Sequence, residues 1–295
     1  MTETVRIKGG TAVITGAASG IGMGLARHAA SLGMNLVLAD INAAQLDTLA
    51  SSLSTEVLAL TVDVRDEAAV ESLAEVAFAR FGQVDMLFNN AGILCTGFSW
   101  EISAERWQKE FDVNVNGVLN GLRAFVPRML KAGRAAHIIN TSSVGGMLPS
   151  AMMSPYSATK AAVVAITESL HAELRLLEAP IDVSLLGPGP VQSAIFSDPV
   201  AIGEEGSGPR VQEFAQMLRS LLSEYGLPAE RFAELVFAGI RQRQFWLFPQ
   251  PEALDAALRQ RMESILARQN PPLSWGGDID SFGTGADREV TNEQA

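Results

Sequence analysis

The stretch TAVITGAASGIGMGLARHAASLGMNLVLAD, residues 11–40, contains two short apolar runs with a helical pattern between them. The runs, at 11–16 and 35–40, are almost continuously hydrophobic, which is typical of strands that are buried on both faces of a parallel sheet. Two parallel strands need a crossover connection, and a helix is the usual one. Residues 11–40 therefore predict a strand–helix–strand unit.

Three glycines, Gly16, Gly20 and Gly22, lie where the first strand of this unit turns into its helix. Glycine lets the backbone turn tightly and approach a ligand without a Cβ atom in the way. The start of the helix offers free N–H groups and a partial positive charge, which together attract a phosphate. A tight packing turn would also use glycines, but the position between a strand and a helix favours a pyrophosphate site.

The same alternation of strand and helix continues along the chain. Helical patterns such as 67–81 and 104–131 separate the later apolar runs. These runs are VLALTVDV (57–64), DMLFNNAG (85–92), AHIINTSS (136–143) and IDVSLLGPG (181–189). The alternation predicts an α/β fold with a doubly wound, Rossmann-type parallel sheet and right-handed crossovers.

The regular alternation of predicted strands and helices ends after residue 193. The Gly-, Pro- and charge-rich segment 197–210 predicts a loop. Two helices at 211–224 and 228–243, a short strand within 244–252 and a helix at 252–268 are expected to follow it. We expect one domain over residues 1–270, with 194–243 as a helical lid over the substrate and 271–295 as an extended tail.

Composition excludes several classes of partner. The chain is 47% hydrophobic and carries a net charge of −11, which argues against nucleic acid, because binding to phosphate backbones needs clustered Lys and Arg. No apolar run is long enough to span a bilayer, and the first ten residues lack the apolar core of a signal peptide. Cys95 is the only cysteine, and the three histidines are scattered, so neither an internal disulfide nor a metal site is expected. A cytoplasmic location is the default expectation.

Asp40 ends the second strand, 18 residues after Gly22. A carboxylate at this place can accept both hydroxyls of an adenosine ribose and would repel a 2′-phosphate. It could instead, or as well, be the N-cap of the next helix. Ser19 and Ile41 supply no cation for a 2′-phosphate, so the sequence favours NAD over NADP.

The stretch SPYSATKAA, residues 154–162, places Tyr156 four residues before Lys160 on an expected helix. Alone, this pair could be an ordinary surface contact. It is one of six motifs that occur in order: TGAASGIG at 15–22, NNAG at 89–92, VNVNG at 113–117, TSSVGG at 141–146, YSATK at 156–160 and PGPV at 188–191. This set resembles the short-chain dehydrogenase/reductase family, in its short single-domain branch, from residue 10 to about residue 193.

The resemblance implies a catalytic tetrad of Asn114, Ser143, Tyr156 and Lys160. Ser143 lies 13 residues before Tyr156, as the family pattern requires. Tyrosine alone is too weakly ionised at neutral pH to act as a base. We expect the Lys160 ammonium to lower the pKa of Tyr156, Ser143 to hold the substrate oxygen, and Asn114 to hold a water that relays protons.

The resemblance also implies a set of NAD contacts. Asp63 and Val64 would flank the adenine, and NNAG would lie near the cofactor or stabilise the central strands. In GPGPVQS, Ser193 replaces the threonine of the common pattern but keeps its hydroxyl. The full expected set is Gly16, Ser19, Gly20, Ile21, Gly22, Asp40, Asp63, Val64, Asn90, Ala91, Gly92, Tyr156, Lys160, Pro188, Gly189, Val191 and Ser193.

The expected substrate contacts are mainly apolar, and no Lys or Arg is obviously aimed at them. They are Cys95, Met147, Met153, Phe196, Phe214 and Met217. Methionine adapts to irregular apolar space, although ordinary core packing would explain each residue too. The pattern favours a bulky apolar secondary alcohol and its ketone.

A closer resemblance is to bacterial Cα-dehydrogenases that oxidise lignin-derived aryl ether dimers with NAD. Steroid or terpenoid alcohols and a non-catalytic NAD(H)-binding regulator remain alternatives. The family resemblance also implies a homotetramer or homodimer, with the helices near 104–131 and 154–178 packing against their copies.

Overall fold

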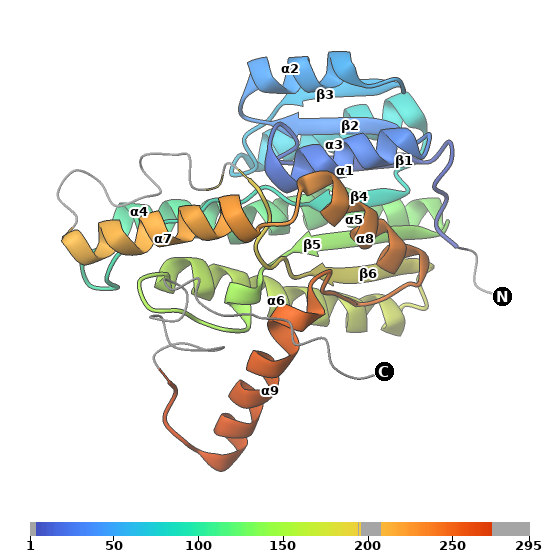
Figure 1. The fold of residues 1–295 in the computed structure, drawn as a ribbon. Coiled ribbons are helices and arrows are strands. Elements are labelled where there is room, and N and C mark those ends of the chain that lie inside the picture. Colours follow the sequence, from blue (N-terminus) through green and yellow to red (C-terminus); the bar gives the residue numbers. More distant parts are fainter. Residues whose placement is uncertain (1–3, 194, 196–207, 273–295) are drawn as a thin grey trace, which may run out of the picture.

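A seven-stranded parallel sheet forms the centre of the computed structural model, which describes residues 4–193, 195 and 208–272 (Figure 1). The strand order is β3-β2-β1-β4-β5-β6-β7. The strands are β1 (Thr11–Thr15), β2 (Asn35–Asp40), β3 (Val57–Thr61), β4 (Met86–Asn89), β5 (Ala136–Thr141), β6 (Ile181–Leu186) and β7 (Trp246–Leu247). The order reverses between β1 and β4, so the predicted doubly wound α/β fold is confirmed.

Helices cover both faces of this sheet. They are α1 (Gly20–Ser31), α2 (Ala43–Ser52), α3 (Glu67–Phe81), α4 (Ala104–Phe111), α5 (Gly117–Ala132), α6 (Ser154–Leu176), α7 (Pro209–Tyr225), α8 (Ala229–Arg241) and α9 (Pro251–Ala267). One core cluster joins α1 and α8 to the sheet, with Leu25, Phe232 and Phe237 fully or almost fully buried. The other joins α3, α5 and α6 to the opposite face, around Leu73 and Phe125.

Several predicted strands are longer than the observed ones. The run 57–64 stops pairing after Thr61, 85–92 after Asn89, and 181–189 after Leu186. The residues that follow leave the sheet as loops at its carboxyl edge. Since the expected site residues lie in these loops, the early strand ends are what expose them to a ligand.

The expected single helix over 104–131 is interrupted. A π-helical turn at Asp112–Asn116 separates α4 from α5. Asn114, in this turn, exchanges hydrogen bonds with the backbone of Ile93, whose N–H donates at 2.8 Å and whose carbonyl accepts at 2.9 Å. The turn thus holds Asn114 against the segment after β4, and π-turns within helices frequently occur at functional sites.

Residues in and next to α9 hold the loops at the carboxyl edge by hydrogen bonds. The strand expected within 244–252 is only Trp246–Leu247, since Pro251 begins α9. The Gln250 amide donates to the Pro190 carbonyl at 2.9 Å, and the Arg261 guanidinium of α9 donates to the Met147 carbonyl at 2.5 Å.

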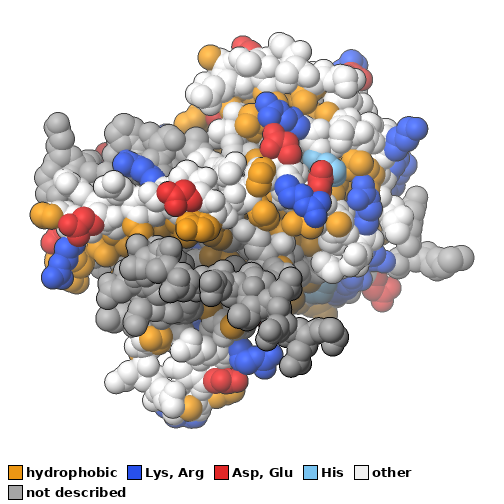
Figure 2. Space-filling view, viewed as in Figure 1, with side chains coloured by type: hydrophobic (Ala, Val, Ile, Leu, Met, Phe, Trp, Pro, Cys, Tyr) orange, Lys and Arg blue, Asp and Glu red, His pale blue; other side chains and the backbone are white. Residues whose placement is uncertain are grey.

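The expected lid begins at residue 194 and includes α7. Helix α7 projects beyond the carboxyl ends of the strands (Figure 1). Figure 2 shows hydrophobic side chains along its lower edge. Helix α8 instead packs against α1, where a Cβ atom on Gly24 would collide with the backbone of Ala229. The lid prediction therefore rests on α7. The loop predicted at 197–210 lies outside the described residues up to 207, and its end is wrong because α7 begins at Pro209; the tail predicted at 271–295 lies outside the described residues from 273.

Candidate active site

Three elements meet at the carboxyl edge of β4 and β5. Tyr156 and Lys160 lie in the first turns of α6, whose second residue, Pro155, is at a position that suits proline. Ser143 follows β5, and Asn114 lies in the π-turn. The four side chains predicted to form a tetrad are thus brought together by different elements.

The Lys160 ammonium lies over the ring of Tyr156. Its Nζ atom is 5.7 Å from the centroid of the Tyr156 ring and donates a hydrogen bond of 2.9 Å to the Thr141 carbonyl. Lys160 is buried, with only 3% of its surface exposed. A buried ammonium requires partners, so the Thr141 carbonyl fixes the position of this charge.

The two serines after β5 have different environments. Ser143 lowers the pKa of Tyr156, and the Ser143 Oγ atom accepts the Gly145 N–H at 3.1 Å. The Ser142 hydroxyl donates to the Lys160 carbonyl at 2.8 Å, which ties the loop to α6. The geometry therefore favours Ser143 over Ser142 as the residue that holds a substrate oxygen.

Asn114 is fully buried beside Lys160. Its amide donates to the Thr159 hydroxyl at 3.0 Å in addition to its bonds to Ile93. A Cβ atom on Gly92 would lie 3.2 Å from Lys160 Nζ and 3.3 Å from Asn114 Oδ1. Gly92 thus lets the chain pass between the two side chains.

Burial controls the charge of the catalytic pair. It raises the pKa of Tyr156 to about 12 and lowers the pKa of Lys160 to about 8. The expectation that Lys160 lowers the pKa of Tyr156 stays a prediction, because burial dominates the shift of both groups. Desolvation penalises the charged form of each group, and Ser143 lowers the pKa of Tyr156 only in part.

The glycine turn has the shape of a pyrophosphate cradle. Gly16 has a φ of +64°, and a Cβ atom there would lie 2.8 Å from the Ala91 backbone. A Cβ atom on Gly22 would collide with the Gly16 carbonyl. The N-cap residue of α1, Ser19, makes no side-chain capping bond. The first N–H groups of α1, from Gly20, Ile21 and Gly22, can therefore bind an anion.

Asp40 lies beside this cradle. Its carboxylate accepts the Ala18 N–H and the Asn42 N–H, each at 2.9 Å, one at each oxygen. The N-cap of α2 is Asn42, so the alternative in which Asp40 caps that helix is wrong. Each carboxylate oxygen retains a lone pair for a ribose hydroxyl.

We expect Asp40→Ala to weaken NAD binding roughly ten- to a hundredfold, because bonds to a carboxylate are worth about 1.5–3 kcal/mol. NADP binding should weaken less, since the variant no longer repels a 2′-phosphate. Calorimetric titration of both cofactors checks this result. Asp47→Ala, which removes an exposed carboxylate of α2, is the matched control. Equal losses for NAD and NADP would contradict the ribose role.

The other expected adenine contacts are partly committed to the protein. The Asp63 carboxylate pairs with Arg65 at 2.6 Å, and this guanidinium lowers the pKa of Asp63. Val64 is buried, and its carbonyl accepts the Asn120 amide at 2.9 Å. Their roles toward the adenine stay predictions.

NNAG stabilises the central strands. The Asn90 backbone N–H binds the Thr15 hydroxyl at 2.9 Å, and its amide donates to the Thr15 carbonyl at 3.0 Å. Ala91 also donates to that hydroxyl, at 3.1 Å. These bonds tie β4 to β1 beside Gly16, and contact between NNAG and the cofactor stays a prediction.

The PGPV segment follows β6 and is held by neighbouring loops. A Cβ atom on Gly189 would lie 2.8 Å from the side chain of Gln250, and Pro188 accepts the Val144 N–H at 3.0 Å. Val191 is buried and bridges to Leu227. Ser193 is half-buried at the end of the continuous described segment.

An apolar cluster packs around Tyr156. It consists of Leu94, Met153, Tyr156, Ile195, Ala215, Leu218 and Leu222. Met153 is thus the expected substrate residue that the structure places beside Tyr156, whereas Leu94, Ile195 and Leu222 were missed. Leu94 lies in a loop, where the sequence has no periodic pattern that could have indicated it. Leu222 lies in α7, whose helical pattern could have indicated it.

The remaining expected substrate residues lie elsewhere in the same region. Met147 is buried near Gly187, Phe214 is buried in α7, and Met217 is half-buried. Cys95 is buried and directs its thiol to Glu110. Phe196 lies outside the described residues. Contact of these side chains with substrate stays a prediction.

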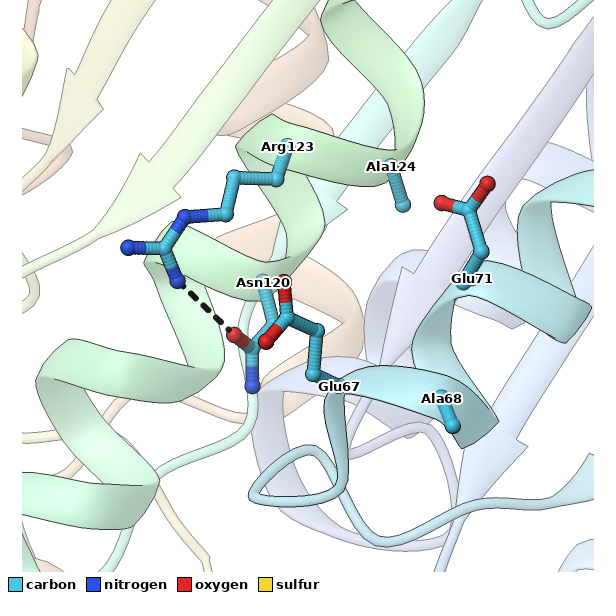
Figure 3. Close-up of a pocket in the computed structure, with 6 residues that line it drawn as sticks. All are labelled: Glu67, Ala68, Glu71, Asn120, Arg123 and Ala124. Carbon is cyan, nitrogen blue, oxygen red and sulfur yellow. Dashed lines mark hydrogen bonds between the residues drawn. The ribbon is translucent and has the colours of Figure 1, made fainter.

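A hollow on the surface lies apart from the tetrad, between α3 and α5 (Figure 3). It is lined by Glu67, Ala68, Glu71, Asn120, Arg123 and Ala124. Arg123 donates to Asn120 at 3.3 Å, and Glu71 pairs with Arg128 at 2.7 Å. None of the tetrad residues lines this hollow, so it is not the candidate active site.

Two findings concern other kinds of site. No cluster of three or more His, Cys, Asp or Glu side chains in the described part of the chain could hold a metal ion. Within residues 4–193, 195 and 208–272, no helix combines the length and apolar character needed to cross a membrane.

Comparison with known proteins gives a consistent family. The family model described as short chain dehydrogenase matches residues 10–200. A 1-deoxy-11-beta-hydroxypentalenate dehydrogenase from Streptomyces exfoliatus is 35% identical, over 86% of this chain and 87% of its own. A C alpha-dehydrogenase from a Sphingobium strain is 30% identical, over 90% of this chain and 93% of its own.

A solved structure is similar over nearly the same length. It is a short chain dehydrogenase/reductase from Burkholderia phymatum in complex with NAD, which is 41% identical with a TM-score of 0.84 and covers 90% of this chain and 97% of its own. The family model spans most of the chain, and these relatives cover 86% to 90% of it. The chain therefore belongs to the short chain dehydrogenase family of oxidoreductases.

Proposed function

We propose that this protein is an NAD-dependent oxidoreductase that interconverts a bulky, apolar secondary alcohol and its ketone. The observation that carries the proposal is the setting of Tyr156, which lies with Ser143 around Gly145, has Lys160 Nζ 5.7 Å from its ring centroid and packs among apolar side chains. A proton acceptor in an apolar pocket suits an alcohol without charged groups.

NAD is the cofactor that fits the residues present. Gly16 and Gly22 leave room for a pyrophosphate at the start of α1, and Asp40 offers a carboxylate for the ribose. Ile41 is 71% exposed and supplies no cation for a 2′-phosphate. The Burkholderia phymatum relative, solved in complex with NAD, supports the same choice.

The side chains divide the work of alcohol oxidation. Bound NAD supplies the hydride acceptor for the alcohol carbon. Tyr156 takes the hydroxyl proton at its phenolic oxygen, and Ser143 holds the substrate oxygen by a hydrogen bond. When Lys160 is protonated, its positive charge favours the phenolate form of Tyr156. Asn114 holds the 93–95 segment in place through its bonds to Ile93. In the ketone direction the same groups return the proton.

Two relatives support the bulky substrate. One is named for hydroxypentalenate and the other as a C alpha-dehydrogenase. The side chains that pack with Tyr156 in this cluster are apolar, which favours an apolar group next to the reacting alcohol. An aryl secondary alcohol is one substrate of this class, and a steroid or terpenoid alcohol is the alternative.

A screen of NAD⁺ reduction over aryl, steroid, terpenoid and small aliphatic secondary alcohols tests the proposal. We expect NADH formation with at least one bulky class and little with 2-propanol. NADH binding without turnover of any alcohol or ketone would favour a cofactor-binding regulator on the same fold.

The assembly and location stay predictions. A homodimer or homotetramer would pack copies through α5 and α6, and the hollow of Figure 3 lies on α5 and α3. Light scattering of the purified protein measures the number of copies. A cytoplasmic location is expected for an enzyme that draws on NAD.

A further inference from the structure

Glu110 is a buried carboxyl group that the proposed reaction does not use. It lies in the last turns of α4, with 1% of its surface exposed. Its Oε2 atom is 2.8 Å from the Cys95 thiol, and its Oε1 atom has no hydrogen-bond partner in the described part of the chain. Burying a carboxylate without full pairing costs free energy, so this side chain needs an explanation.

The segment from Gly92 to Cys95 connects Glu110 to the catalytic pair. At one end, a Cβ atom on Gly92 would lie 3.2 Å from Lys160 Nζ. In the middle, Asn114 binds the N–H and carbonyl of Ile93. At the other end, Cys95 binds Glu110, while α4 packs against α6. Glu110 and Asn114 are four residues apart, and both hold this short segment against α6.

The groups that face Glu110 make its charge important. The charge of Glu110 acts on Lys160 and Tyr156 of α6, which packs against α4, its Oε2 accepts the Cys95 thiol, and the charge of Arg106 acts on that thiol. Burial raises the pKa of the Cys95 thiol, and the negative charge of Glu110 raises it further. The thiol therefore remains protonated and donates to the carboxylate.

Glu110 acts on both members of the catalytic pair. Its negative charge raises the pKa of Tyr156 and that of Lys160. Burial raises the pKa of Glu110 itself to about 7, while the Cys95 thiol and the Lys160 charge oppose this shift. Near neutral pH the carboxyl therefore changes its charge beside Tyr156 and Lys160.

We propose, building on the proposed function, that Glu110 is a positioning residue whose buried carboxyl, held by the Cys95 thiol, sets the charge beside Tyr156 and Lys160 and thereby the pH range of catalysis. As a carboxylate it delays the loss of protons from both groups. As a neutral acid it has no such effect. The segment 92–95, held by Asn114 and Cys95, keeps the carboxyl at a fixed place relative to Lys160.

The pH dependence of kcat for alcohol oxidation in Glu110→Gln tests this proposal. Removing the negative charge lowers the pKa of both Tyr156 and Lys160, so the rising limb should move to lower pH by roughly 0.5–1 unit. The falling limb of ketone reduction should move in the same direction. Glu105→Gln, which removes an exposed carboxylate of the same helix, should leave both limbs in place.

A second variant guards against loss of folding. Cys95→Ala keeps the carboxyl but removes its donor, so Glu110 should stay neutral to higher pH and the profile should again move to lower pH. Profiles of Glu110→Gln and Cys95→Ala that superimpose on the parent profile would overturn the proposal, even where kcat itself falls.

The S–H stretching band in the infrared provides a readout that does not depend on activity. Cys95 is the only cysteine in the chain, so the band reports one thiol. We expect its frequency to change as Glu110 titrates near pH 7 and this change to vanish in Glu110→Gln. A band that does not respond to pH would also overturn the proposal. Failure of the dehydrogenase assignment would instead appear as absent turnover with the S–H titration intact.

Discussion

Replacing Tyr156 with Phe is expected to lower kcat for alcohol oxidation roughly a hundred- to ten-thousandfold, the range contributed by a positioned general base. The substitution removes only the phenolic hydroxyl, which is the group that accepts the substrate proton. The ring remains to pack with Leu94 and Met153, so the fold and the apolar pocket should persist. Steady-state NADH formation measures the loss.

Binding of NADH should change little in Tyr156→Phe, because the glycine turn and Asp40 lie on other elements. Fluorescence titration of NADH checks this expectation. Tyr225→Phe is the matched control, since Tyr225 is the other tyrosine in the chain and is 66% exposed. Substantial activity in Tyr156→Phe would remove the basis of the proposed mechanism.

The second large effect is expected for Ser143→Ala, with a loss of about a hundred- to a thousandfold in kcat. This is the cost typically found when one donor to a developing oxyanion is removed. Ser143 also donates toward Tyr156 and favours its ionised form, so its loss should shift the pH profile of oxidation to higher pH. Initial rates over a pH series measure both effects.

Ser142→Ala separates the two adjacent serines. The Ser142 hydroxyl binds the Lys160 carbonyl, so its removal should lower the free energy of unfolding by about 1 kcal/mol. Its kcat should fall much less than that of Ser143→Ala. A larger loss of kcat in Ser142→Ala than in Ser143→Ala would contradict our proposal that Ser143 holds the substrate oxygen.

The parallel sheet could be predicted because its strands are buried on both faces. Residues 11–16 and 35–40 are continuous apolar runs, and both became strands within one residue of the predicted ends. Other predicted strands, such as 57–64, extend too far, because apolar residues follow the last residue that pairs in the sheet. Val62 and Val64 are buried by packing on helices instead of by strand pairing, and a local pattern does not distinguish the two.

The π-turn could not be predicted from local sequence. Asn114 lies in a pattern that would continue as an α-helix, and the cause of the irregularity is its pair of bonds to Ile93, 21 residues earlier. Such a contact depends on the folded arrangement of β4 and α4. An asparagine within a helical pattern gave only an indirect signal.

The members of the tetrad could be named from motif spacing, but their electrostatics could not. The expectation for Tyr156 considered the nearby Lys160 charge and not the depth of burial, which raises the pKa of the tyrosine. Glu110 was missed because its partner, Cys95, comes from a loop 15 residues away. Its position four residues before Asn114 is the signal that could have placed it on the same face.

Transfer of a carbinol deuterium to NAD⁺ tests the central proposal most directly. A bulky secondary alcohol that gives turnover is labelled with deuterium at the carbinol carbon, and the NADH formed is analysed by mass spectrometry. The proposed mechanism predicts NADH that carries one deuterium from the alcohol, formed roughly a hundred- to ten-thousandfold more slowly with Tyr156→Phe. NADH without deuterium, or labelled NADH formed at an equal rate by the Tyr156→Phe variant, would contradict hydride transfer assisted by Tyr156.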